Sequence, residues 1–275
     1  MKQLNYTLLS LLLTGTLMIF QSCQKEELTE IQEENATWDV ELKKADATRT
    51  FYGPTVKVGN GVARAYVKEN RNGDPVEVGL NLSVKALENL PDHHADFVLP
   101  FHPNKGKRFY DHVFIGWAPE GHEPPGVYDL PHFDVHFYIT SVEDREAIGG
   151  QPGYDMMPAP EYIPQDYILL EGIVPQMGAH WADALAPELP WNGGATFTHT
   201  FIWGSYHGEF TFMEPMITRD FLLSLSEQPS VTAEVKHPVA WQRDGWYPSH
   251  YRMEWTNQPG QYTIALTGLE WKESL

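Results

Sequence analysis

The sequence of 275 residues contains one cysteine, Cys23. A second thiol would be needed for a disulfide within the chain or for a thiolate metal site, so both are excluded. The folded chain therefore has to gain its stability from a hydrophobic core or from a bound ion.

Basic residues are scarce as well: 19 Lys and Arg stand against 37 Asp and Glu, a net charge of −18. Without residues 1–22, which hold one lysine and no acid, the net charge is −19. This charge argues against nucleic acid and against anionic membrane surfaces as partners.

Several familiar motifs are missing. The sequence has no glycine-rich phosphate loop, no Gly-x-Ser-x-Gly elbow, no His-Glu-x-x-His helix and no repeat of fixed period. These absences argue against the nucleotide-binding, serine hydrolase and zinc protease classes that depend on those motifs.

The N-terminus has the pattern of a secretion signal. Lys2 precedes an apolar run of 13 residues, 8–20, and Cys23 follows small and polar residues. A helix needs roughly 20 residues to cross a bilayer, so the run is too short to span one. The segment resembles a bacterial lipoprotein signal peptide, 1–22, with Phe20 where leucine is usual. An uncleaved anchor with an incidental thiol is the alternative.

The residues after Cys23 point to the cell envelope. Gln24-Lys25-Glu26-Glu27 resembles the tag of surface-displayed lipoproteins of the Bacteroidetes group. We therefore expect an outer-membrane lipoprotein that is held to the lipid bilayer through acylated Cys23. The tag makes display of the protein at the cell surface one option. An ordinary solvated charge run is the alternative for the tag. Residues 23–50 are polar and acidic, as in a tether.

Residues 51–275 have the pattern of a single β-rich domain, because alternating apolar residues and turn motifs recur and helical periodicity is rare. We expect a mainly β fold: an antiparallel β-barrel or barrel-like sandwich with long loops and a few short helices. The expected strands are 55–58, 62–67, 76–84, 112–117, 132–140, 167–174, 197–202, 209–213, 231–235, 252–255 and 262–266. The expected helices are 84–90, 142–148 and 219–226, the last with Thr218 as its N-cap.

The segment 131–139, Pro-His-Phe-Asp-Val-His-Phe-Tyr-Ile, carries the clearest chemical signal. In a strand, successive side chains alternate between faces, which puts His132, Asp134 and His136 opposite an apolar face. Imidazole and carboxylate together suit zinc, iron or manganese. A wet polar strand face is the alternative.

Strand spacing complicates a site made from this segment alone. His132 and His136 are about 13 Å apart in an extended strand, and a metal lies only about 6.5 Å from the Cα of a histidine ligand. Further ligands must come from elsewhere in the chain, unless the strand bends or Asp134 and His136 form the pair. His180 is a candidate because it follows Gly178, where the backbone can turn sharply.

Glu214 is the best acidic candidate. It shares the apolar face of a predicted strand with Phe210 and Phe212, and a carboxylate there is costly unless it is paired or bound to a cation. The alternative is a strand-end glutamate that reaches water before Pro215. His199, which alternates with aromatic residues, is expected to form a core hydrogen bond.

Two further groups of residues are candidates for binding or catalysis. His122 and Glu123 lie between glycine and proline in a loop, where they could form a rigid turn or supply an acid or base. Aromatic rings near the C-terminus could stack on sugar rings or pack in a β core: Trp241, Trp246, Tyr247, Tyr251 and Trp255.

Three phrases carry a family resemblance: residues 121–138, residues 177–189 with Met-Gly-Ala-His-Trp, and residues 197–218, which end in Phe-Met-Glu-Pro-Met-Ile-Thr. Over about residues 113–218 the chain resembles an uncharacterised bacterial family typified by a ring-forming Thermus protein under sigma-E and anti-sigma-E control. The resemblance implies a β-rich fold and a homo-oligomer, and it brings no activity. At His207 the family pattern has aspartate, so His207 is not expected to be a ligand.

The sequence thus supports three hypotheses. The first is a divalent metal site from His132, His136, His180 and Glu214, used for metal-assisted hydrolysis or isomerisation, with Asp134 or His122 as a supporting or acid–base group. The second is a non-catalytic surface module that binds a glycan or another small ligand through the tryptophan-rich region. The third is a structural stress-response oligomer in which the histidines stabilise the fold.

Overall fold

The computed structural model describes residues 47–103, 109–149 and 156–275. Thr48–Leu275 form one compact unit, and its first strand begins at Arg49, slightly before the predicted boundary at residue 51. The predicted signal peptide, Cys23 and the tether up to residue 46 lie outside the described residues. No helix within the described ranges has the length and apolar character needed to cross a membrane.

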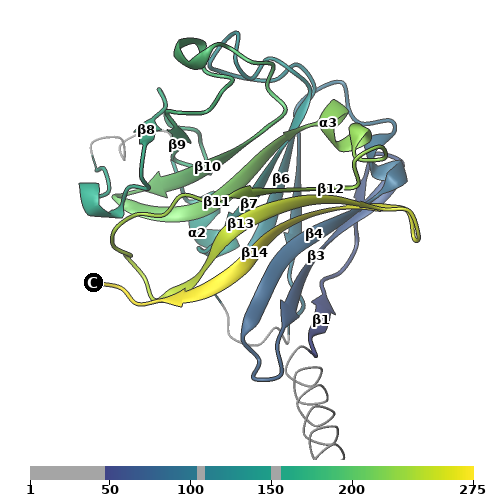
Figure 1. Ribbon diagram of the computed structural model, residues 1–275, viewed down its shortest axis with the longest axis horizontal. Helices are drawn as coiled ribbons and strands as arrows, with labels where there is room; N and C mark the ends of the chain where they lie inside the picture. Colours follow the sequence, from purple (N-terminus) through teal and green to yellow (C-terminus); the bar gives the residue numbers. More distant parts are fainter. Residues whose placement is uncertain (1–46, 104–108, 150–155) are drawn as a thin grey trace, which may run out of the picture. The chain divides into compact units, whose positions relative to one another are not determined.

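The first of two antiparallel sheets holds seven strands in the order β1-β3-β4-β14-β13-β12, with β2 also paired to β3. Figure 1 shows β3, β4, β14 and β13 side by side in this layer. The strands are β1 (Arg49–Tyr52), β2 (Val56–Val58), β3 (Gly61–Glu69), β4 (Pro75–Ser83), β12 (Ser230–Glu234), β13 (Gly245–Thr256) and β14 (Gln261–Lys272).

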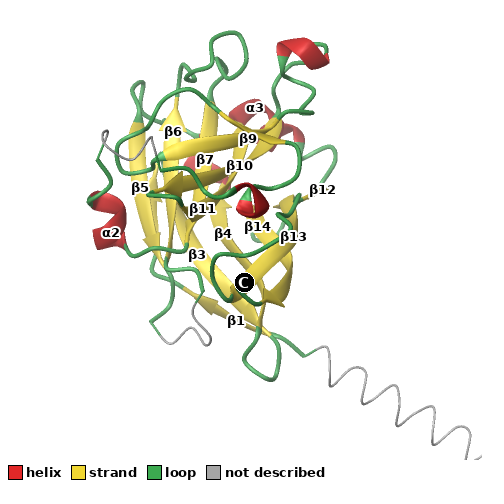
Figure 2. Cartoon of the chain, turned by 90° about the vertical axis from the view of Figure 1, so that its left-hand side faces the viewer, coloured by secondary structure: helices red, strands yellow, loops and turns green. Residues whose placement is uncertain are grey.

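The second sheet also holds seven strands, in the order β5-β6-β7-β11-β10-β9-β8. Its three central strands are β7, β11 and β10, and β7 lies beside β11 although the two are distant in sequence (Figure 2). The strands are β5 (Ala95–Pro100), β6 (His112–Ala118), β7 (His132–Tyr138), β8 (Tyr167–Leu169), β9 (Ala179–Asp183), β10 (His199–Tyr206) and β11 (Glu209–Thr218).

The main hydrophobic core lies between the two sheets. Leu80, Ile264 and Met253 from the first sheet and Val135 and Trp203 from the second belong to one buried cluster. Within the described residues neither sheet closes on itself, so the fold is a sandwich and not a closed barrel. The predicted mainly β, antiparallel fold with few short helices is confirmed in this form.

The alternation predicted for β7 is present. Phe133, Val135 and Phe137 belong to the core between the sheets. His132 and His136 therefore point to the outer face of the second sheet. Every residue of β7 is nevertheless buried, because loops cover this outer face.

The short helices begin and end close to their predicted bounds. Thr218 caps α3 (Arg219–Ser224) by accepting a hydrogen bond from the Phe221 N–H at 3.2 Å, as its position before the helix predicts. The other two are η1, a 3₁₀-helix (Val84–Leu87), and α2 (Val142–Glu146). Two further 3₁₀ turns lie in loops, η2 (Pro160–Tyr162) and η3 (Pro190–Asn192).

Several strand predictions were wrong. The strand expected at 167–174 ends at Leu169, and β1, β5 and β9 were not predicted. β11 was expected to end at residue 213 but continues through Pro215 to Thr218. Because of that continuation, Glu214 does not escape to water as a strand-end residue, and only 1% of it is exposed.

A β-bulge corrects the predicted face of Phe210. The pairing of β10 with β11 shifts between Gly204 and Ser205, where Thr211 is the extra residue. Phe210 consequently packs in the core between the sheets, whereas Phe212 packs on the outer face with Phe114 and Tyr138. Glu214 thus shares its face with Phe212 but not with Phe210.

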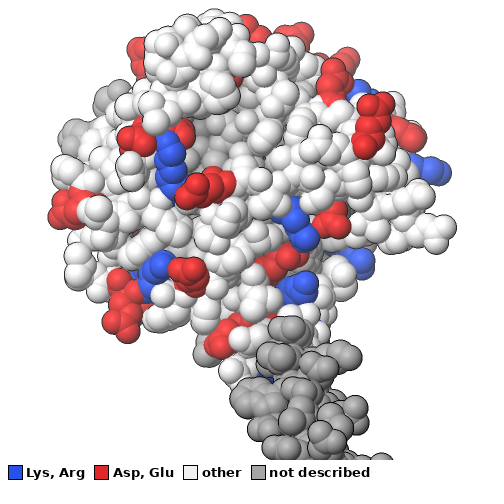
Figure 3. Space-filling model, in the orientation of Figure 1, with Lys and Arg blue, Asp and Glu red and all other residues white. Residues whose placement is uncertain are grey.

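Charged side chains on the face of the molecule shown in Figure 3 are more often acidic than basic, and several acids adjoin a base. Among the ion pairs of the molecule, Lys236 contacts Asp166 at 3.1 Å and Asp183 at 2.8 Å. No cluster of Lys and Arg gathers among the described residues drawn on this face.

Candidate metal centre

A cavity of about 530 Å³ lies over the outer face of the second sheet. Its floor includes Asp134, His136, His180 and Glu214, and the loop that carries His122 also borders it. The remaining walls are largely apolar and come mainly from the segment between β8 and β9: Leu170, Ile173, Val174 and Met177, with Ile202 and Met216 from the sheet. The cavity can hold a small molecule of largely apolar character.

Among the described residues, two groups of ligand-type side chains lie close together, and the first, here called the inner triad, is His136, His180 and Glu214. Their ligand atoms all lie within 4.8 Å of one another. The Nε2 atom of His136 is 3.5 Å from Oε1 of Glu214, and Nε2 of His180 is 3.9 Å from Oε2. These contacts exceed hydrogen-bond length.

Strand register brings the inner triad together. Met213 pairs with Phe137 and Met216 with Asp134, so the same register puts Glu214 opposite His136 on the neighbouring strand. His180 pairs with Gly204 of β10, the strand between β9 and β11. Three strands that are distant in sequence thereby present one side chain each to the same point.

Gly178 makes the turn into β9 possible. Its φ is +97°, and a Cβ at this position would lie 2.3 Å from the carbonyl oxygen of Ser205. Only glycine fits both the backbone angle and the space. The position of His180, two residues later, therefore depends on this glycine, as the Met-Gly-Ala-His pattern suggested.

Burial controls the protonation of the inner triad. It lowers the pKa of His136 to about 3 and that of His180 to about 4, so both imidazoles are neutral near pH 7. Burial, and secondarily the charge of Asp134, raises the pKa of Glu214 well above its ordinary value. A cation between these groups would reverse the penalty on the carboxylate.

The tautomer of His136 suits a metal ligand. Its Nδ1 atom lies 3.3 Å from the carbonyl oxygen of Phe114, which can only accept, so Nδ1 carries the ring proton. The lone pair of Nε2 then faces Glu214, and neither this Nε2 nor Oε2 of Glu214 has a hydrogen-bond partner. A backbone carbonyl on the far ring nitrogen is the usual support of a metal-binding histidine.

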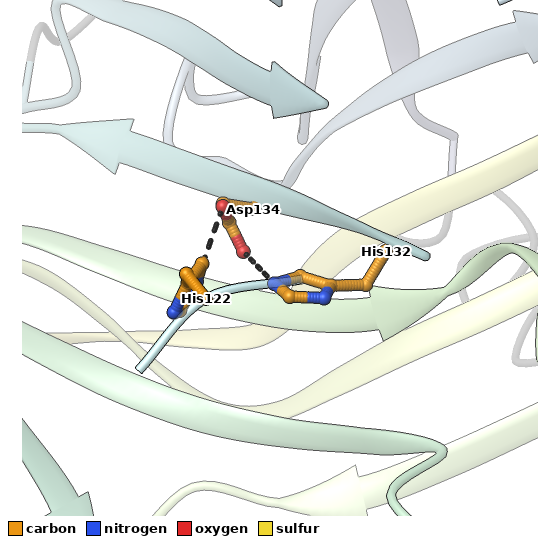
Figure 4. A group of neighbouring side chains, drawn as sticks. All are labelled: His122, His132 and Asp134. Carbon is orange, nitrogen blue, oxygen red and sulfur yellow. Dashed lines mark ion pairs between the residues drawn. The ribbon is translucent and has the colours of Figure 1, made fainter. Parts of the chain in front are cut away.

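His122, His132 and Asp134 form the second group, here called the outer triad. Figure 4 shows the Asp134 carboxylate between the two imidazoles, with His132 and Asp134 on β7 and His122 on the preceding loop. Nε2 of His132 is 3.0 Å from Oδ1 of Asp134, and Nε2 of His122 is 3.5 Å from Oδ2. The three ligand atoms again lie within 4.8 Å of one another.

The carboxylate of the outer triad is ionised. Burial alone would raise the pKa of Asp134, but the contacts with His122 and His132 outweigh burial and hold the pKa well below its usual range. For His122, burial lowers the pKa and the contact with Asp134 raises it, with a net rise. The carboxylates of the two triads thus have pKa values shifted in opposite directions: that of Asp134 is lowered, and that of Glu214 is raised.

The spacing of both triads suits a shared ion. Two ligand atoms that bind one ion at about 2.1 Å lie about 3.0 Å apart at a right angle and about 3.4 Å apart at the tetrahedral angle. The contacts of 3.0, 3.5 and 3.5 Å lie at or next to this range, and that of 3.9 Å is somewhat longer. Groups that could hold a divalent cation are therefore present, with two nitrogen donors and one carboxylate in each.

The structure places the six predicted site residues at one cavity or beside it. The sequence predicted one site of four ligands with two supporting residues, whereas the structure forms two groups of three. His136, His180 and Glu214 lie together, whereas His132, expected as their partner, lies in the outer triad with Asp134 and His122. The reason is strand spacing, because alternate residues of β7 point at separate positions along the sheet.

Sequence reasoning did not identify the apolar cavity wall or the pair Tyr128 and Glu188. Glu188 is 4% exposed, and burial raises its pKa and that of Tyr128. A buried glutamate between two apolar segments was a possible signal for Glu188. The wall residues lie in a loop without periodicity, so no sequence pattern marked them.

The aromatic residues near the C-terminus mostly serve the core. Tyr247 and Tyr251 are buried between the sheets, and Trp241, Trp246 and Trp255 pack against the same core. His199 stacks on Phe221, with ring centroids 4.6 Å apart, and burial lowers its pKa.

Comparison with known proteins gives one match. Residues 70–117 match the family model TTHB210-like, described as hypothetical protein TTHB210. No curated protein matches the chain significantly, and no solved structure does. The matched segment runs from the turn before β4 into β6, which precedes the 121–138, 177–189 and 197–218 phrases that carry the resemblance. The match supports that resemblance: over residues 70–117 the chain is similar to the TTHB210-like family, and all six triad residues lie beyond the matched segment.

Proposed function

We propose that this protein binds a divalent cation of the zinc, iron or manganese class at the inner triad and uses it on a small molecule held in the cavity. His136, His180 and Glu214 are the protein ligands. Two imidazoles and one carboxylate leave further coordination positions open for water or for a substrate oxygen.

One observation carries the proposal: within the described part of the chain, the buried Glu214 has ion-pair contacts only with the buried His136 and the partly buried His180. Among the described residues no Lys or Arg side chain forms an ion pair with Glu214, and its Oε2 has no hydrogen-bond partner. Burying a carboxylate in this way is costly unless a cation compensates for the lost hydration. Neutral imidazoles with outward lone pairs on either side are the groups that hold such a cation.

The residues around the inner triad favour hydrolysis or isomerisation of a polar group on a largely apolar molecule. A metal ion polarises a bound carbonyl or lowers the pKa of a bound water, which supports hydrolysis or isomerisation. The apolar wall from residues 170–177 excludes bulk water from one side of the ion. Tyr128 also borders the cavity, and burial raises the pKa of its hydroxyl, so it stays a neutral hydrogen-bond donor.

The metal content of the purified protein tests the proposal. We expect Glu214→Gln and His136→Ala each to lose one equivalent of metal relative to the wild type, by inductively coupled plasma mass spectrometry. His112→Ala is the matched control, because His112 is also a buried histidine on β6 of the same sheet and belongs to neither triad. Equal metal content in all four proteins would refute the proposal.

Activity is measured separately on esters and lactones small enough for the cavity. We expect turnover to disappear after treatment with a chelator and to return with Zn²⁺, Mn²⁺ or Fe²⁺. Turnover that survives complete metal removal would contradict a metal-assisted reaction.

A further inference from the structure

The outer triad is a separate arrangement from the site proposed above. We infer that His122, His132 and Asp134 hold a second divalent cation at the same cavity, with its own set of ligands separate from those of the ion at the inner triad. This assignment replaces the acid–base role that the sequence suggested for Asp134 and His122.

The ring protons of both histidines point away from Asp134. Nδ1 of His132 lies 2.6 Å from the carbonyl oxygen of Leu130, and Nδ1 of His122 lies 2.8 Å from the carbonyl oxygen of Glu123. A carbonyl oxygen only accepts, so each Nδ1 must donate. In the neutral rings both Nε2 atoms then present lone pairs to the carboxylate.

With both imidazoles neutral, two acceptors face each other in a buried place, so either a ring proton or a metal ion has to lie between them. His132 is fully buried and Asp134 is 4% exposed. Nε2 of His132 and Oδ1 of Asp134 lie 3.0 Å apart, yet their angles are not those of a hydrogen bond, and both atoms lack any hydrogen-bond partner. An acid–base pair would share a proton along this line. A cation beside the line, bound by both lone pairs, satisfies both atoms.

The ligand types select the class of cation. Two imidazole nitrogens and one carboxylate suit zinc, manganese, iron or cobalt, whereas calcium and magnesium favour sites made of oxygen. The side chain of His122 is 37% exposed and borders the cavity, so open coordination positions face the cavity. An ion here exchanges with solvent more readily than one at the inner triad.

Strand geometry keeps the two ions apart. Asp134 and His136 are two residues apart on one face of β7, which separates their Cα atoms by roughly 7 Å. A bridged pair of ions would need to lie about 3.5–4 Å apart. We therefore expect two separate ions, not a bridged pair, that can contact different groups of one bound molecule.

Metal stoichiometry of matched variants tests this inference. The purified protein is loaded with Zn²⁺, freed of excess ion and analysed by inductively coupled plasma mass spectrometry. We expect two equivalents in the wild type, one each in Asp134→Asn, His132→Ala and Glu214→Gln, and none in the double variant Asp134→Asn with Glu214→Gln. His112→Ala should keep two.

The outcomes separate the two sites. A wild type with one equivalent that is lost in Glu214→Gln and kept in Asp134→Asn overturns the second site and leaves the proposed function intact. The reverse pattern supports the outer triad and refutes the inner one. Two equivalents retained in Asp134→Asn also overturn the inference.

The variant His122→Ala distinguishes loss of the second ion site from loss of the fold. His122 lies on a loop and is partly exposed, so its removal should not disturb β7, whereas His132 is fully buried. Circular dichroism should match that of the wild type, and the Kd for Co²⁺ at the second site, followed by visible absorption, should rise at least tenfold. An unchanged Kd would overturn the role of His122.

Discussion

His136 and Glu214 lie opposite each other on β7 and β11, with Nε2 of the imidazole 3.5 Å from Oε1 of the carboxylate, and both are buried. At this distance the pair is too long for a hydrogen bond and suits a shared ion. Removing either partner takes away one ligand atom of the proposed ion site and leaves the other side chain buried beside it.

Replacing Glu214 by Gln should separate metal binding from folding. Burial raises the pKa of Glu214, so a neutral amide is a close substitute for the protonated carboxyl in the metal-free protein. We expect the metal-free variant to unfold within about 1 kcal/mol of the wild type or to be more stable. Chemical denaturation of both proteins in a chelator measures this.

Added metal should then stabilise the two proteins differently. An ion present at 100 times its Kd stabilises the folded state by about 2.7 kcal/mol per site. We expect the wild type to gain more than Glu214→Gln by about this amount at saturating Zn²⁺. An equal rise of Tm in both proteins would show that the ion does not bind at Glu214.

The stability of the metal-free protein should peak near pH 6.5. His136 and His180 have folded pKa values of about 3 and 4, below the ordinary 6.5, so between pH 4.5 and 6.5 the unfolded state binds two protons that the folded state does not. Glu214, with a raised pKa, retains one proton in the folded state over this range. These three groups together therefore differ by one net proton between the two states, which makes their contribution to stability rise with pH by about 1.4 kcal/mol per unit.

Above pH 6.5 the sign reverses. The two histidines are then neutral in both states, while folded Glu214 keeps a proton that the unfolded chain has lost, so stability falls until the pH passes the folded pKa of Glu214. The raised pKa of His122 acts in the same direction. Urea unfolding from pH 5 to 9 should show this maximum, with a smaller fall above pH 6.5 in Glu214→Gln. A stability that rises steadily to pH 9 would contradict the prediction.

Gly178→Ala should damage the metal centre through His180. The new Cβ would lie 2.3 Å from the Ser205 carbonyl oxygen at a φ of +97°. We expect a loss of about 1–3 kcal/mol in the free energy of unfolding and weaker metal binding. Gly193→Ala is the matched control, because its φ is +111° but nothing lies within 4 Å of the added Cβ. Equal metal affinity in both variants would show that the turn does not position His180.

Cys23→Ser tests membrane attachment. If Cys23 carries the lipid anchor, the variant should move from the detergent phase to the aqueous phase in a phase-separation assay and should lose incorporation of labelled fatty acid. An unchanged partition would contradict anchoring through this residue.

The alternation of apolar and polar residues determined much of the fold. A two-residue period needs no partner strand, so the core side of β7, with Phe133, Val135 and Phe137, could be predicted from the sequence. Glu214 could be selected for the same reason, because a carboxylate on an aromatic strand face is costly unless it is paired, and the sequence alone shows that placement. The cap of α3 at Thr218 is also a local feature, and it was predicted.

Other features of the site depend on contacts that no local pattern encodes. The bulge at Thr211 decides which of Phe210 and Phe212 shares a face with Glu214, and it arises from the pairing of β10 with β11. The cavity wall from residues 170–177 comes from a loop whose path is set by packing over the sheet. Neither feature has a sequence period.

The sequence by itself determined that this chain is a mainly β protein with a polar strand face rich in histidine and an isolated buried acid. Only the tertiary structure decided that His136 meets Glu214 and His180, while His132 meets Asp134 and His122. The physical reason is reach: a side chain contacts a ligand only a few ångströms away, and the register between strands distant in sequence decides which side chains come within that distance.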